Sequence, residues 1–205
     1  MKRKAKKFFT TILAAIMLGT IVYLIFFRNM EVKKEIEPPK VVKKIDDFGY
    51  ELRENEIKLY SDLFDVLIEE LNKEEVNEEE YAKLVAKLFV VGFYNLDNKT
   101  SKNDVGGVQF VHPDIVDNFK ENAKDTLYKY VESNIYGDRK QELPIVDNIE
   151  VSNLKTRAFK YNDITDKKAY EISLEWSYKK DLGYETECEL IIVHEDKKLV
   201  VVEMD

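Results

Sequence analysis

The stretch KAYEISLEWSY, residues 168–178, alternates apolar and polar side chains and decides the fold class. Its apolar members are Tyr170, Ile172, Leu174, Trp176 and Tyr178, and between them stand Glu171, Ser173, Glu175 and Ser177. A period of two is typical of a β-strand with one face on a core and the other in water. The stretch therefore predicts an antiparallel sheet with one polar face.

Three more strands are predicted around this one. Residues 148–161 form the first, with a kink or bulge, because the alternating set Ile149 and Val151 gives way to Phe159 and Tyr161 near its end. Residues 184–192 follow a turn at Gly183, and residues 199–204 end the sheet. Since consecutive strands are joined by short turns, the four are expected to pair as an antiparallel meander.

Three helices are predicted before the sheet. Apolar residues spaced by three and four indicate one helix over residues 52–72 and another from Asn77, whose side chain can cap the amide of Glu79 or Glu80. A third starts at about Pro113 and runs to Val131. Helices followed by a meander indicate an α+β fold in which about three helices pack on a four-stranded antiparallel sheet.

A polar loop, residues 94–109, separates the second and third helices. Gly106 and Gly107 predict a tight turn there, because a glycine pair without the lysine and hydroxyl of a P-loop is a weak phosphate signal. Asn98-Lys99-Thr100 has the pattern of a glycosylation acceptor, but the turn chemistry of the loop accounts for these residues.

The segment FFTTILAAIMLGTIVYLIFF, Phe8–Phe27, contains no charged residue. Twenty helical residues span about 30 Å, the thickness of the hydrocarbon core of a bilayer. A cleaved signal peptide is the alternative, but its apolar stretch is about 7–15 residues long and ends in small residues. Because this segment ends in Phe26, Phe27 and Arg28, it predicts an uncleaved transmembrane helix over residues 8–27.

The charges on either side of this segment predict its orientation. Residues 1–7 carry five of the 32 Lys and Arg residues, which leaves 27 positive against 40 negative side chains, or −13, for the rest. The basic stub is expected in the cytoplasm, residues 28–47 with Pro38 and Pro39 form a stalk, and residues 48–205 form an extracytoplasmic domain. The bilayer is thus an expected partner, and the acidic body argues against nucleic acid.

Few residues suit catalysis. His112, His194 and Cys188 have no partners at ligand or catalytic spacing, so we expect turn or edge roles for the histidines and a buried, inert thiol. A single cysteine also excludes a disulfide scaffold. The sequence predicts a protein that is not an enzyme and has no metal or cofactor; an exported enzyme would require either histidine to meet an acid inside a cleft.

Two surfaces are candidates for binding. The first is an aromatic ligand pocket on the helix-covered face of the sheet, formed by Phe159, Tyr170, Trp176, Tyr178 and Tyr184. The second is a partner face on the outer side of the sheet, formed by Glu171, Glu175, Glu185, Glu187 and Glu189. Ordinary core packing and a solvated face are the respective alternatives.

This layout of stub, span, stalk, helices and terminal meander resembles the nuclear transport factor two-like cone fold. More narrowly, it resembles the bitopic assembly proteins of type IV secretion and conjugation machines. Where that family often has an Asn-Pro-x-Gly turn, this chain has Tyr136-Gly137 and then Glu142-Leu143-Pro144. The resemblance implies a scaffold without catalytic residues that contacts other envelope proteins or a second copy of itself. A ligand-binding sensor that uses the aromatic interior is the alternative function.

Overall fold

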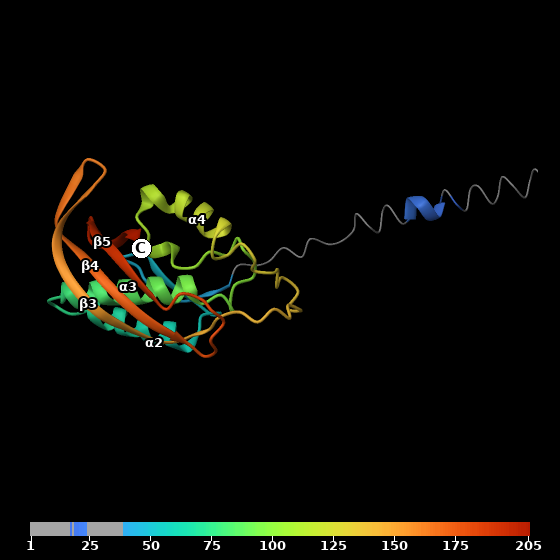
Figure 1. Cartoon of the computed structure of the whole chain (residues 1–205), viewed down its shortest axis with the longest axis horizontal. Coiled ribbons are helices and arrows are strands. Elements are labelled where there is room, and N and C mark those ends of the chain that lie inside the picture. Colours follow the sequence, from blue (N-terminus) through green and yellow to red (C-terminus); the bar gives the residue numbers. More distant parts are fainter. Residues whose placement is uncertain (1–16, 18, 24–38) are drawn as a thin grey trace, which may run out of the picture. The chain divides into compact units, whose positions relative to one another are not determined.

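The computed structural model describes residue 17, residues 19–23 and residues 39–205 (Figure 1). Residues Pro39–Asp205 form one compact unit. Its elements are β1 (Val41–Ile45), β2 (Tyr50–Arg53), α2 (Lys58–Leu71), α3 (Glu78–Tyr94), the 3-10 helices η1 (Val108–Phe110) and η2 (Pro113–Ile115), α4 (Val116–Asp125), β3 (Val146–Tyr161), β4 (Ile164–Tyr178), β5 (Glu187–Glu195) and β6 (Lys198–Met204).

The predicted α+β class and four-stranded antiparallel sheet are confirmed. The strands pair in the order β3-β4-β5-β6. Asn162 and Asp196 adopt positive φ angles in the two tight turns of this meander, a conformation that Asn and Asp tolerate better than other side chains. The third strand begins at Glu187 and not at Tyr184, and the second begins four residues before Lys168.

The bulge predicted in β3 is confirmed and changes which side chains reach the core. The register shifts between Val151 and Asn153, so the alternation moves by one residue and Leu154, opposite Ile172, stays on the helix-covered side. Phe159 then turns to the opposite side. It packs there against a second apolar cluster, formed by Ala169, Ile191, Val193 and Val200, and Figure 1 shows this end of the β3–β4 hairpin bending away from the sheet.

Helix α3 is the centre of the core. Twelve of its residues are buried, and the helix lies against the strands of the large sheet. Asn77 accepts a hydrogen bond from the amide of Glu80 at 3.2 Å, as its position predicted. Helix α2 packs on α3, and α4 reaches α3 through Phe119, whose ring is 5.1 Å from that of Phe93. The prediction that three helices pack on the sheet is therefore corrected: α3 is the main covering helix, and α2 and α4 flank it.

The first helix is shorter than predicted, because residues 50–53 form a strand. Tyr50 and Leu52 are buried at alternate positions and pair with residues 41–45, which the sequence placed in a stalk. Gly49 joins the two strands with φ +62°. Four alternating residues are too few to distinguish a strand from the first turn of a helix, and pairing with the preceding segment decides the outcome.

The third helix also ends earlier than predicted. It ends at Asp125, and Tyr128 lies in the turns that follow. The buried Tyr128 hydroxyl donates to the carbonyl of Phe93 at 2.6 Å and accepts from the amide of Gly106 at 3.0 Å. These two hydrogen bonds hold the chain after α4 against the end of α3, in place of further helix.

The predicted transmembrane segment lies mostly outside the described residues. Within it, residue 17 and residues 19–23 are helical. No helix in the described part of the chain combines the length and the hydropathy needed to cross a bilayer.

Candidate functional site

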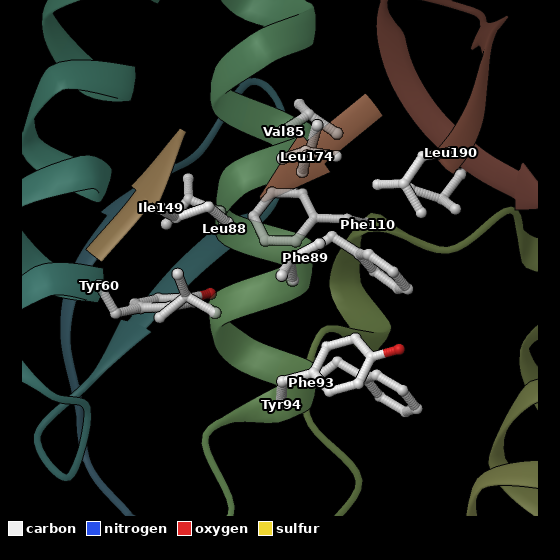
Figure 2. Close-up of a cluster of buried hydrophobic side chains, with 14 of the residues drawn as sticks. Tyr60, Val85, Leu88, Phe89, Phe93, Tyr94, Phe110, Ile149, Leu174 and Leu190 are labelled. Carbon is white, nitrogen blue, oxygen red and sulfur yellow. The ribbon is translucent and has the colours of Figure 1, made fainter. Parts of the chain in front are cut away.

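The five residues of the expected aromatic pocket lie in separate places. Tyr170 donates to Glu78 at 3.2 Å near the start of α3, whereas Trp176 packs against Tyr94 with ring centroids 4.5 Å apart. Tyr178 and Tyr184 contact each other beyond the end of β4, and Phe159 lies on the other side of the sheet. The interior between them is filled by core side chains, several of which Figure 2 shows around α3.

One of these five aromatic residues, Tyr184, lines a groove of about 490 Å³. Its walls include Phe93, Tyr94, Val131, Tyr184 and Met204. Trp176 and Tyr170 are buried and do not line this groove. The groove therefore includes fewer aromatic residues than the pocket that the sequence predicted.

The five glutamates of the predicted partner face do not form one continuous surface. Glu171 is bound by Arg157 at 2.6 Å and by Lys155 at 3.3 Å. The hydrogen bond from Lys155, with that from Arg157, lowers the pKa of Glu171 below its usual value. Glu185 precedes β5, where its carbonyl accepts from the Tyr178 hydroxyl at 2.8 Å. Glu171 is thus neutralised, and Glu185 lies off the sheet.

A row of three exposed glutamates remains on this face. Glu150, Glu175 and Glu187 stand directly opposite one another on β3, β4 and β5. Among the described residues, no cation pairs with any of the three. Like charges at directly opposed positions destabilise a sheet, so this row is an unfavourable arrangement for the isolated domain. Glu189 lies two residues after Glu187 on β5. It is half-buried, and its carboxylate accepts a hydrogen bond from the Ser173 hydroxyl at 3.4 Å.

His194 lies between two carboxylates. Its Nδ1 is 2.8 Å from Asp166 and its Nε2 is 2.9 Å from Glu78. Burial acts to lower the pKa of His194, but the hydrogen bonds to Asp166 and Glu78 outweigh it and the pKa is raised. Burial likewise acts to raise the pKa of Asp166, and the hydrogen bonds from His194 outweigh it, so that pKa is lowered.

This cluster borders a cavity of about 350 Å³ that also contacts Phe48, Val76 and Lys198. His194 therefore meets acids beside a cleft, which is the arrangement that an exported enzyme would require. Both ring nitrogens are engaged, however, so neither can accept a substrate proton while the two carboxylates stay in place. The cluster joins the start of α3 to β4 and β5.

We expect this cluster of His194, Asp166 and Glu78 to make the free energy of unfolding depend on pH. The His194 contribution is complete below about pH 6.5, the unfolded pKa of histidine, and is lost as the pH rises through the raised folded pKa. The Asp166 contribution is present above about pH 3.9 and is lost as the pH falls through the lowered folded pKa. The cluster should therefore stabilise the fold most between about pH 4 and 6.5.

Urea unfolding of the wild type and of His194→Gln across this pH range measures the effect. Because the pairs are partly exposed, the two proteins should differ by only about 1 kcal/mol near pH 5.5, and the difference should shrink above pH 8. A difference that stays constant from pH 5 to pH 9 would contradict the assignment.

The other two residues considered for catalysis have structural contacts. The Nδ1 of His112 accepts from the amide of Asp114 at 3.2 Å, and its ring packs on that of Tyr161. This matches the predicted turn role. Cys188 is buried on the core side of β5, and burial raises its pKa to about 12, so the thiol is held in its unreactive form.

A lysine in the polar loop is the residue that sequence reasoning missed. Lys99 is only 4% exposed and lines a cavity of about 160 Å³. The other walls come from β2, from the loop before α2 and from the glycine pair, and they include Arg53, Asn55 and Gln109. A Cβ atom on Gly106 would lie 2.9 Å from the Lys99 Nζ, so the ammonium group sits directly against this glycine.

The loop that carries Lys99 is held firmly in place. Arg139 donates to the carbonyl of Lys99 at 2.7 Å and to that of Asp97. The side-chain amide of Asn98 donates to the Asn55 carbonyl at 3.1 Å and to Glu56 at 2.9 Å. The amide nitrogen that a glycan would modify is therefore engaged inside the fold, and the lysine beside it is fixed.

No signal in the sequence identifies Lys99, because it stands among polar residues typical of an exposed loop. Comparison with protein-family models, with curated proteins and with solved structures finds no match to this chain.

Proposed function

We propose that the chain is a single-pass membrane protein whose extracytoplasmic domain works by binding another envelope protein. The observation that carries the proposal is the uncharged segment Phe8–Phe27, which follows a basic stub and precedes the folded unit Pro39–Asp205 by 11 residues, 28–38. Five cations on one side and mixed charges on the other favour an orientation with the amino terminus in the cytoplasm.

The glutamate row supplies the surface for the partner. Glu150, Glu175 and Glu187 repel one another in the free domain, and a basic surface docked on β3–β5 would relieve that repulsion. A scaffold related to secretion or conjugation assembly proteins, which the layout of the sequence resembles, would use such a contact without any catalytic step.

Membrane topology is the first test. Full-length protein tagged at both ends should remain with membranes after alkaline washing, and protease added to intact cells should remove the carboxyl-terminal tag alone. Replacing the five cations of residues 1–7 with glutamine should produce molecules of inverted orientation. Recovery of the wild type in the soluble fraction would refute the anchor.

Partner binding is the second test. Cross-linking in membranes should capture an envelope protein or a second copy of the chain, and Glu175→Lys should weaken that capture. The same substitution should leave stability unchanged or raise it by about 0.2–1 kcal/mol, since it replaces two repulsive pairs with two attractive ones. Glu69→Lys, on an exposed position of α2, is the matched control. Equal capture by both variants would exclude this face.

A further inference from the structure

Among the described residues, none forms an ion pair or a hydrogen bond with the ammonium group of Lys99. Lys99 lines the cavity. Burial, the main cause, lowers the pKa of Lys99, the charges of Glu56 and Asp104 oppose that shift, and the charge of Arg53 adds to it. A buried charge without a partner is costly, so native proteins seldom keep one unless it has a function.

The carboxylates nearest to Lys99 are engaged elsewhere. Asp104 accepts from the amide of Thr100 at 2.9 Å and from its hydroxyl at 3.2 Å, and Glu56 accepts from Asn98. Arg139 fixes the backbone of Lys99 itself. The unpaired ammonium therefore lies beside carboxylates that already accept other hydrogen bonds, and an anionic group inside the cavity would pair with it.

Two residues of the cavity wall have unmatched acceptors. The buried Oδ1 of Asn55 has no hydrogen-bond donor among the described residues. Glu51 lines the cavity too, and its backbone is held by Gln109 while its carboxylate makes no hydrogen bond or ion pair in the described part of the chain. A ligand that fits must present an acceptor to Lys99 and a donor to Asn55 and Glu51.

We propose that this cavity binds a small zwitterion, a free amino acid with a short side chain, through its carboxylate on Lys99 and its ammonium near Asn55 and Glu51. Its volume of about 160 Å³ is below the roughly 300–1,000 Å³ of pockets for drug-sized ligands. A multiply charged anion such as phosphate would face three carboxylates, those of Glu51, Glu56 and Asp104, against the two cations Arg53 and Lys99, and is disfavoured. The site lies within the folded unit and is independent of the proposed anchor.

Calorimetry on the full-length chain in detergent tests the ligand class. The probes are glycine, L-alanine and L-serine as zwitterions, with acetate, methylammonium and inorganic phosphate as single-charge or anion controls. At least one zwitterion should bind, and the controls should bind at least about tenfold more weakly, because each lacks one charge-assisted contact. Binding of acetate or phosphate as strong as that of every zwitterion would overturn the proposal.

Lys99→Met tests the residue. It should weaken zwitterion binding at least about tenfold, yet it should not lower the thermal midpoint of the ligand-free protein, because it removes an unpaired buried charge and keeps an apolar stem. Lys102→Met, at an exposed position of the same loop, should change neither quantity. The proposal fails if no zwitterion binds the wild type at millimolar concentration, or if Lys99→Met binds as the wild type does. It also fails if Lys99→Met loses its fold, which would make the lysine structural.

Discussion

Phe89→Ala is expected to lower the free energy of unfolding by about 3–5 kcal/mol. Phe89 is fully buried on α3, and its ring lies 5.9 Å from that of Phe93 (Figure 2). The ring of Phe119 lies 5.7 Å from that of Phe89. The substitution leaves a cavity where α3 meets α4, and the fixed rings around it cannot collapse to fill it. Since domains are stable by about 5–15 kcal/mol, the loss is a large share of the total.

Urea unfolding followed by circular dichroism measures the change. Val66→Ala is the control, because Val66 is an apolar residue on the neighbouring α2 but is 48% exposed, and its replacement should cost no more than about 0.5 kcal/mol. Similar midpoints for the two variants would show that α3 does not have the central position described.

Gly106→Ala should destabilise the fold by about 3 kcal/mol or more. A Cβ atom at this position would lie 1.8 Å from the carbonyl oxygen of Gly92, a backbone atom of α3 that cannot move without disturbing the helix. It would also press on Lys99. Gly106 thus allows the loop to approach α3 closely. The sequence predicted a tight turn at this glycine but not the contact with the helix.

Gly183→Ala separates this steric effect from backbone strain. Gly183 has φ +77° and open space around its Cα atom, so its substitution should cost only the roughly 1–2 kcal/mol of a left-handed residue. Thermal unfolding of both variants decides the point. Equal losses would mean that Gly92 and Gly106 are not in close contact.

Local patterns predicted much of the fold. The period-two alternation around Leu174 identified the sheet, its polar face and its order, and the spacing of Leu84, Leu88 and Phe89 identified the central helix. The Asn77 cap was predicted correctly because capping depends on residues within one turn. Local information was insufficient for the β1–β2 hairpin, which is stabilised by pairing of two short segments whose patterns are individually ambiguous.

The candidate sites were predictable only in part. The outer-face position of Glu175 and Glu187 follows from alternation, but the addition of Glu150 to the row depends on the register of β3. The bulge after Val151 moved Phe159 to the other side of the sheet, and the sequence indicated a bulge without fixing its position. One residue of uncertainty in register exchanges the two faces of a strand.

Local patterns were enough to predict the α+β class, the antiparallel meander and the uncharged segment before the folded unit, because each depends on neighbouring residues. Tertiary packing places His194 between Glu78 and Asp166, and it buries Lys99 with no ion-pair or hydrogen-bond partner for its ammonium among the described residues. The first arrangement brings together residues far apart in the chain, such as Glu78 and His194. The burial of Lys99 depends on which segments cover its loop. Local periodicity carries no information about such contacts, because they are set by the packing of whole elements.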